Sequence, residues 1–195
     1  MKDMEVSKMA ATKKYYIPVG SGDMYYKDFN GTIPEDSEIE KDDNRIGYIK
    51  DGATITYSPT SQSFKDDLGI VSRSVITAEE AKLAGNLIAW SSADMPVFIA
   101  TARVTETAKN GTTHRVIKIG GMNNDNKKVY CFRFVHKDAE YGDVRITIVG
   151  RSQAEISLTY KQDDSSQIAL EVTAQSQDSE GTLILYDEDT KVTSA

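Results

Sequence analysis

The amino-acid sequence predicts a mainly β fold: an antiparallel β-sandwich or barrel with one flanking α-helix and long loop extensions. Three observations support this prediction. Thr, Val, Ile and Tyr recur in short alternating runs, which are typical of half-buried strands. Clusters of Gly, Asn and Asp separate these runs, as turns do. Helical spacing is convincing only between Thr77 and Trp90, so the chain lacks the strand–helix rhythm of a parallel sheet.

The N-terminal half is expected to hold short strands divided by polar loops. The strand candidates are, in order, 14–19, 24–29, 46–50, 53–57 and 69–75. Asp51-Gly52 lies between the third and fourth candidates and favours a tight hairpin turn, because glycine tolerates a positive φ. The stretch 58–67 is polar and contains Pro59, so it is expected to be a loop.

Residues 77–90 have the features of a helix. Thr77 and Glu80 have the spacing of a capping box, in which each side chain bonds the backbone at the other position. Ala81, Ala84 and Leu87 then recur at helical spacing, with Ile88 beside them. This segment is the predicted flanking helix.

The C-terminal half returns to β-like patterns. The strand candidates are 97–107, 113–119, 129–135, 144–148, 156–160, 168–174 and 182–186. Within 129–135, alternation predicts Tyr130, Phe132 and Phe134 on one face, and Val129, Cys131 and Val135 on the other with Arg133. Asn110-Gly111 predicts a hairpin turn between the first two. We expect one domain over 1–195, with an N-terminal arm at about 1–14 and a polar tail at about 188–195.

Composition excludes several classes of protein. The formal net charge of −7 disfavours a protein that grips nucleic acid over its whole surface. No stretch approaches the roughly 18 apolar residues that a membrane helix needs, so no membrane partner is expected. Cys131 is the single cysteine and cannot form an internal disulfide, which fits a reducing compartment such as the cytoplasm.

The sequence shows no recognisable catalytic or cofactor site. His114, His136 and Cys131 are too few and too scattered for a zinc site. No G-x-S-x-G motif is present, and Gly20-Ser21-Gly22 lacks the residues of a phosphate-binding loop. We therefore expect no metal, no cofactor and no enzymatic activity.

Two further features of the N-terminal half stand out. The first is an acidic stretch that contains Gly31 and Pro34 and is expected to be a long loop rather than a helix; its carboxylates are Glu35, Asp36, Glu38, Glu40, Asp42 and Asp43. The second is a pair of adjacent tyrosines, present at Tyr15-Tyr16 and at Tyr25-Tyr26, because adjacent side chains on a strand point to opposite faces. A sheet covered on both sides, for instance by a neighbouring subunit, would accommodate both rings.

Four segments carry a resemblance to a known family; they are 17–25, the hairpin-like 45–57, the passage 74–81, and 168–174 with 180–183. In these segments and in the order of its elements over about 15–187, the chain resembles the major tail protein of siphophages, the tail tube subunit. That resemblance implies a small β-sandwich that forms hexameric rings, which stack into a hollow tube in the virion after synthesis in the host cytoplasm. It also implies tape-measure and tail-terminator proteins as partners, and transient passage of DNA through the lumen.

The resemblance leads to two hypotheses about assembly. In one, the acidic loop 30–44 is disordered in the free subunit and orders against Lys or Arg of the adjacent ring. In the other, strands around 46–57 and 70–75 contribute to the wall of the lumen. A tube protein of a contractile tail or a secretion system is an alternative within the same class. A β-sandwich that binds carbohydrate or protein, and an enzyme on a β-scaffold, are alternatives of other classes.

Overall fold

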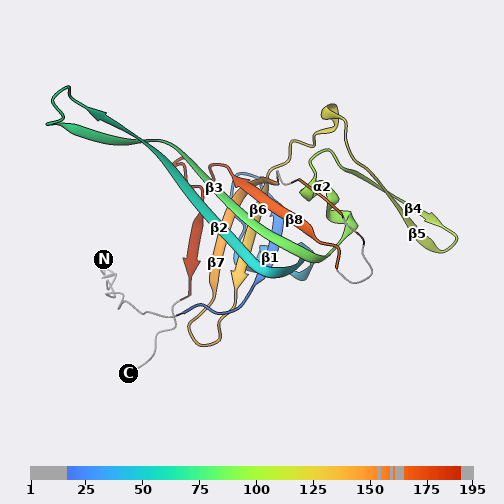
Figure 1. Cartoon of the computed structure of the whole chain (residues 1–195). Coiled ribbons are helices and arrows are strands. Elements are labelled where there is room, and N and C mark those ends of the chain that lie inside the picture. The colour runs from blue at the N-terminus through green and yellow to red at the C-terminus, as the bar shows by residue number, and fades with distance from the viewer. Residues whose placement is uncertain (1–16, 153–154, 159, 161–164, 190–195) are drawn as a thin grey trace, which may run out of the picture.

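A closed ring of antiparallel strands forms the body of the molecule in a computed structural model that describes residues 17–152, 155–158, 160 and 165–189. The strands are β1 (Asp23–Asp28), β2 (Arg45–Lys65), β3 (Ser72–Trp90), β4 (Arg103–Lys109), β5 (Thr112–Lys118), β6 (Tyr130–His136), β7 (Val144–Ser152), β8 (Ile168–Ala174) and β9 (Leu185–Glu188). The short helices are α1 (Asp36–Ile39) and α2 (Met95–Phe98), with 3-10 turns η1 (Asp42–Asn44), η2 (Ser92–Asp94) and η3 (Met122–Asn124). The predicted mainly β, antiparallel fold is confirmed (Figure 1).

Strand pairing explains how the ring closes. The large sheet has seven strands in the order β6-β1-β2-β3-β8-β7-β9, and β6 also pairs with β7. This extra pairing joins the two sides of the sheet, and β9 pairs with the first half of β7. A closed ring leaves few free strand edges in the body. Strands β4 and β5 form a separate two-stranded sheet.

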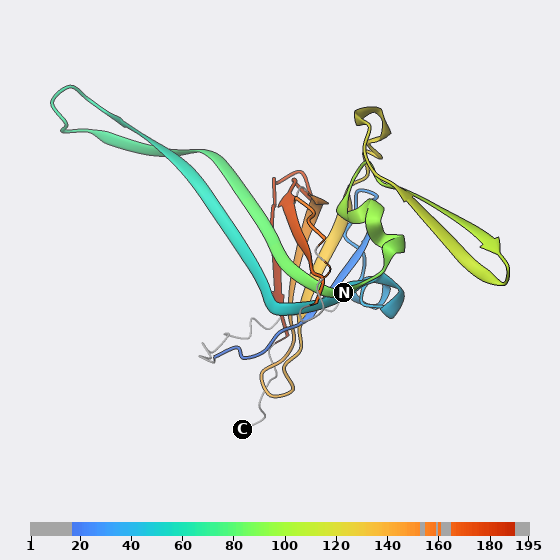
Figure 2. The same cartoon turned by 45° about the vertical axis from the view of Figure 1, so that its right-hand side comes forward.

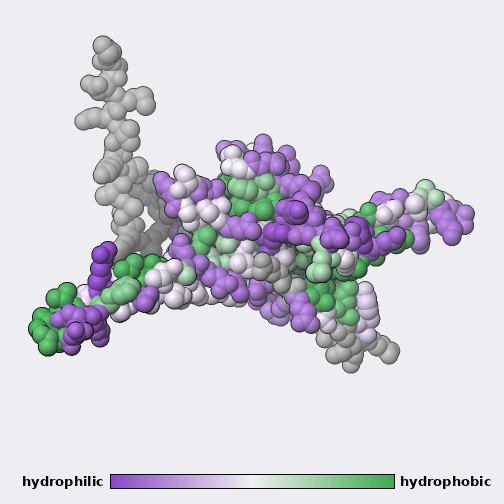
Figure 3. Space-filling model, turned by 90° about the horizontal axis from the view of Figure 1, so that it is seen from above, coloured by the Kyte–Doolittle hydropathy of each residue, from purple (hydrophilic) through white to green (hydrophobic). Residues whose placement is uncertain are grey.

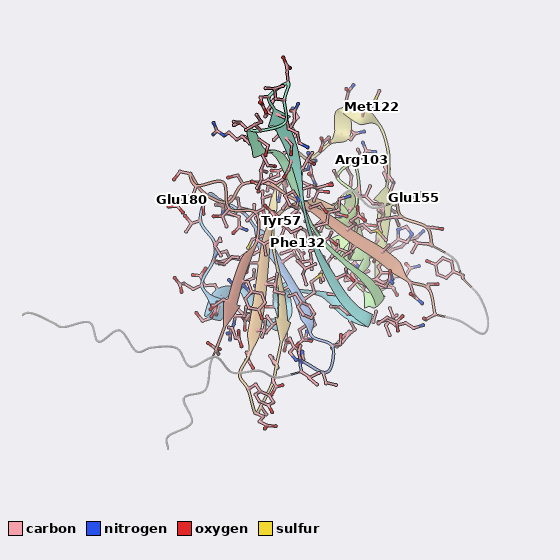
Figure 4. All side chains as sticks on the ribbon, turned by 60° about the vertical axis from the view of Figure 1, so that its left-hand side comes forward. Tyr57, Arg103, Met122, Phe132, Glu155 and Glu180 are labelled. Carbon is pink, nitrogen blue, oxygen red and sulfur yellow. The ribbon has the colours of Figure 1, made fainter. Side chains whose placement is uncertain are left out.

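The main core fills the inside of the ring. Its largest buried side chains are Met24, Ile46, Leu83, Leu87, Phe98, Phe132, Ile148, Ile168 and Leu170. Phe132 lies among the strands of the body (Figure 4). The predicted faces of β6 are confirmed, because Tyr130, Phe132 and Phe134 all belong to this inner cluster.

A second, smaller core covers the outer face of β1, β6 and β7. It consists of Cys131 and Val135 of β6 together with Tyr25, Val149 and Ile39, and all five side chains are buried. Ile39 comes from the acidic segment, which therefore packs on the sheet. Tyr25 and Tyr26 face the outer and inner clusters respectively, so a segment of the same chain covers the second face.

The predicted helix at 77–90 is wrong, because this segment lies within β3. Strand β3 pairs with β2 along its whole length and with β8 from Lys82 to Leu87. Ala81, Leu83 and Leu87 are buried, and Ala81 and Leu83 already show the two-residue period of a strand. The same apolar residues satisfy both periods, and pairing on two edges decides for the strand.

The predicted loop at 58–67 and the predicted turn at Asp51-Gly52 are also wrong. Strand β2 continues to Lys65, and the chain reverses between Asp66 and Val71, which are joined by a backbone hydrogen bond of 3.0 Å. Asp51 and Gly52 have φ of 65° and 79° but form a bulge, because their neighbours Lys50 and Ala53 pair with the adjacent residues Asn86 and Gly85. Some bulges use the same left-handed backbone as a tight hairpin turn, so the two residues suit either structure.

Other expectations for the C-terminal half are met in part. The Asn110-Gly111 turn is confirmed, with φ of 52° and 74° between β4 and β5. The candidates at 129–135, 144–148 and 168–174 correspond to β6, β7 and β8. The candidate at 97–107 begins instead as α2, which places Phe98 in the core, and becomes a strand only at Arg103.

The remaining expectations, at loops and chain ends, need correction or lie outside the described residues. Among the described residues of 156–160 there is no strand, and the last strand lies at 185–188 rather than 182–186. Residues 17–19 of the first candidate are not in a strand, and its remaining residues lie outside the described ranges. The N-terminal arm 1–14 and residues 190–195 of the tail also lie outside the described ranges.

Candidate assembly surfaces

The β2–β3 arm, residues 56–80, projects from the body as a two-stranded ribbon. Every residue in it is exposed. Its register runs from Thr56 opposite Lys82 to Lys65 opposite Ser72. Figures 1 and 2 show it extending well beyond the other strands. Along the arm both outer strand edges lack a partner strand among the described residues, because β1 pairs with β2 only near Arg45 and Gly47. Free edges of this kind can pair with another chain.

The end of this arm carries an apolar tip. Its side chains are Phe64, Leu68, Ile70 and Val71, which are exposed by 54%, 81%, 78% and 67%. Figure 3 shows this hydrophobic surface in green at the far end of the arm. Two adjacent carboxylates, Asp66 and Asp67, accompany it. Burying apolar surface is favourable by about 25 cal/mol per Å², so covering the tip with a partner would stabilise the complex.

The sequence reading missed the apolar tip because it treated 58–67 as a loop. Pro59 was the misleading signal. Proline is tolerated on a strand edge that makes no ladder bonds, and Pro59 lies in the stretch of β2 whose outer edge is free. The useful signal was the turn-forming run Asp66-Asp67-Leu68-Gly69, where Gly69 has φ of 69°.

The β4–β5 arm, residues 103–118, leaves the body on the other side from the apolar tip (Figures 1 and 2). At its base Val104 and Ile117 pack against the main core. Beyond that point its residues are exposed. Arg115 pairs with Glu106 across the two strands at 2.6 Å.

The acidic segment, residues 35–43, is held on the outer face of the sheet by arginines of β6 and β7. Arg133 pairs with Asp36, and its guanidinium lies 3.6 Å from Glu40. Arg145 lies 2.7 Å from Glu40 and 2.6 Å from Asp189. The hydrogen bond to Asp189, and after it the bond to Glu40, raises the pKa of Arg145, although partial burial acts in the opposite direction. The prediction of a long loop rather than a helix is therefore wrong here, because the segment contains α1 and the start of η1 and is held against the sheet.

The remaining carboxylates of the segment face solvent. Glu38 bonds Lys27 at 2.8 Å, and this lysine lowers the pKa of Glu38. Asp42 lies 3.1 Å from Arg45, but its side chain is 93% exposed. Glu35 and Asp43 are exposed and form no ion pair within the described part of the chain. Besides Glu38, which Lys27 binds, the segment thus presents three outward carboxylates, Glu35, Asp42 and Asp43, on a fixed base.

A groove lies where β2 begins and β3 ends. It measures about 710 Å³ and is lined by Tyr48, Trp90, Arg45, Asp42 and Asp94 among others. The guanidinium of Arg45 lies 5.4 Å from the ring centre of Tyr25 and 5.3 Å from that of Tyr48, within the range of cation–π contacts. Tyr48 is 60% exposed, so one aromatic face is open to a ligand.

Potential reactive groups are dispersed in the structure. Burial raises the pKa of the Cys131 thiol to about 11, so it remains protonated at neutral pH. His136 is buried at the end of β6, whereas His114 is exposed on β5. In the ranges that the structure describes, no three His, Cys, Asp or Glu side chains are grouped in a way that could hold a metal ion. No described helix is long and apolar enough to span a membrane.

Comparison with known proteins gives no family for this chain. No protein-family model matches the chain, and no curated protein matches its sequence.

Proposed function

We propose that this protein is a structural subunit that assembles with copies of itself into stacked rings, as the major tail tube protein of a siphophage does. The observation that carries the proposal is the β2–β3 arm with its exposed apolar tip. An isolated two-stranded ribbon is only marginally stable in water. A neighbouring copy that covers the tip and pairs with the free edges would stabilise it.

The geometry of the arm favours an assembly that propagates. The ring of strands closes the body, whereas the arm keeps its free edges at a distance from it. A contact between the arm and a different surface of the next copy is heterologous. Such contacts form rings when the rotation closes and tubes when it does not.

The overall charge is compatible with a DNA conduit. A net charge of −7 per subunit repeats around any ring of these chains. A lumen lined by negative charge repels phosphates, so DNA can slide without sticking. In this proposal the working location is the virion, and tape-measure and tail-terminator proteins are the further partners. No catalytic step or cofactor is part of it.

The test is a comparison of assembly between the wild-type chain and a tip variant. We expect wild-type protein at high concentration to form rings or tubes in negative-stain micrographs. Leu68→Ser/Ile70→Ser should reduce the sedimenting fraction about tenfold, since it removes the apolar contact. The matched control Ile17→Ser/Val19→Ser changes side chains that are 82% and 77% exposed away from the arm and should assemble normally.

Two outcomes would contradict the proposal. One is a wild-type protein that stays monomeric at all concentrations, with no copy of it along the shaft of virus particles that contain it. The other is a tip variant that assembles as well as the wild type. Circular dichroism of both variants shows whether the body remains folded.

A second candidate function is carbohydrate binding in the groove beside Trp90. The exposed ring of Tyr48 and the partly buried ring of Trp90 line the groove beside the carboxylates of Asp42 and Asp94, an arrangement suited to a sugar ring. Trp90 is the only tryptophan, so its fluorescence reports binding at this groove directly. A saturable change with an oligosaccharide, lost in Tyr48→Ala, would favour this candidate over assembly.

A further inference from the structure

One face of the β4–β5 arm carries positive charge without a counter-charge from the described part of the chain. Residues directly opposite each other in an antiparallel pair lie on the same face. The register pairs Arg103 with Lys118, Thr107 with His114 and Lys109 with Thr112, so these residues share one face. We call Arg103, Lys109 and Lys118 the basic face. The glutamate of the arm, Glu106, lies on the other face and is paired with Arg115.

The basic face is not neutralised by its own chain. Arg103, Lys109 and Lys118 are exposed and form no ion pair within the described residues; Arg103 only donates a 3.4 Å hydrogen bond to the Gly120 carbonyl. Arg103 and Lys118 are direct cross-strand neighbours, and like charges in that position repel each other. An external anionic surface would relieve this repulsion.

The acidic segment has the complementary charge. Its outward carboxylates, Glu35, Asp42 and Asp43, sit on a base fixed by the ion pairs to Arg133 and Arg145 and by the buried side chain of Ile39. Because this base is already ordered, less conformational entropy is lost when a partner forms ion pairs with it. The two surfaces belong to different elements, which do not pair with each other within one chain.

We propose that the basic face of the β4–β5 arm docks on the acidic segment of a second copy of this chain. This inference rests on the proposed self-assembly and specifies one of its contacts. A second copy is favoured over nucleic acid because the chain is acidic overall and the basic face offers just three cations. The contact joins unlike surfaces, so each copy keeps one donor and one acceptor for the next.

Charge reversal and charge exchange test the contact. We expect Lys109→Glu/Lys118→Glu to reduce the assembled fraction about tenfold, and Glu35→Lys/Asp43→Lys to do the same, because each places like charges together. Combining all four substitutions should restore most of the assembly, since the pairs are reversed but again opposite in sign. The control Glu180→Lys/Asp187→Lys has the same net charge change as the acidic variant and should assemble as the wild type does.

A cross-link gives a second, independent readout. Lys118→Cys protein mixed with Asp43→Cys protein should form a disulfide-linked dimer on oxidation, and neither should do so efficiently alone. Cys131 is fully buried and adds little background. Full assembly by both reversed pairs, or absence of the mixed dimer, overturns the docking contact while leaving self-assembly intact. Failure of the wild-type chain to assemble overturns both proposals. Electrophoretic binding of duplex DNA, lost in Lys109→Glu/Lys118→Glu while assembly is unchanged, replaces the contact with a nucleic-acid site.

Discussion

Arg133 links the acidic segment to the sheet at the level of single side chains. The residue is 4% exposed and lies on the outer face of β6. Its Nε donates a 3.0 Å hydrogen bond to the Thr147 hydroxyl on β7, and its guanidinium also pairs with Asp36. Arg145, two residues along the neighbouring strand, binds Glu40 and Asp189. Two arginines therefore hold three carboxylates from distant parts of the sequence.

We expect Arg133→Met to lower the free energy of unfolding by about 1–3 kcal/mol. Methionine fills much of the space but removes the closer of the two arginines that pair with Asp36. Arg145 stays 3.5 Å from this carboxylate, and Asp36 is half exposed, so water also compensates in part. Urea unfolding at pH 7 measures the change. The control Lys27→Met removes a more exposed pair with Glu38 and should cost clearly less. Equal losses in the two variants would contradict this role of Arg133.

At the level of elements, the junction of β7 and β8 depends on a glycine. Gly150 pairs with Tyr130 of β6 on one side and with Ala174 of β8 on the other. A Cβ atom at this position would lie 2.1 Å from the Thr173 carbonyl oxygen, which is backbone and cannot rotate away. The absence of a side chain lets β8 approach closely enough to complete the ring.

Gly150→Ala should therefore destabilise the body by about 1–3 kcal/mol. Thermal and urea unfolding measure the loss. Gly85→Ala is the matched control, because it is also a strand glycine but its Cβ would meet Met24 Cε at 3.5 Å, an ordinary contact. We expect that variant to be neutral within about 0.5 kcal/mol. If Gly150→Ala is equally neutral, the strands at this junction are not as close as the structure has them.

At the level of the whole molecule, the free subunit is far from spherical. The ring of strands forms a small body, and the β2–β3 and β4–β5 arms leave it on different sides (Figures 1 and 2). Both arms expose most of their surface to solvent, which is unusual for a protein that functions as a free monomer. An assembly in which the arms are covered accounts for that shape.

Small-angle scattering of a dilute monomer tests the shape. A chain of 195 residues folded into a sphere-like domain has a radius of gyration of about 16 Å, and we expect a clearly larger value. Removing 59–79 and joining Ser58 to Glu80 by Asn-Gly should shorten the arm at a register pair and reduce the radius. The melting temperature of the body should stay nearly unchanged, since the deleted residues are all exposed. An equal radius for both chains would show that the arm folds back on the body.

The local sequence pattern predicted the structure correctly where that pattern fits only one kind of secondary structure. The alternation of β6 predicted which side chains face each way, and the Asn110-Gly111 turn predicted the β4–β5 hairpin. The acidic segment was recognised as a special surface, yet its anchoring was not. Asp36 and Arg133 are far apart in the sequence, so no local signal could pair them.

By itself the sequence determined that the chain is mainly β, that Cys131 makes no internal disulfide, and that its turns use Asn-Gly and Asp-rich runs. These properties follow from composition and from periods of two residues, which are local. Only the tertiary structure decided that 77–90 is a strand, that Asp51-Gly52 is a bulge, and that the reversal of the chain lies at 66–71. The reason is that a strand is stabilised by partners elsewhere in the chain, so pairing on both edges of β3 outweighs a helical pattern that is equally compatible with its residues.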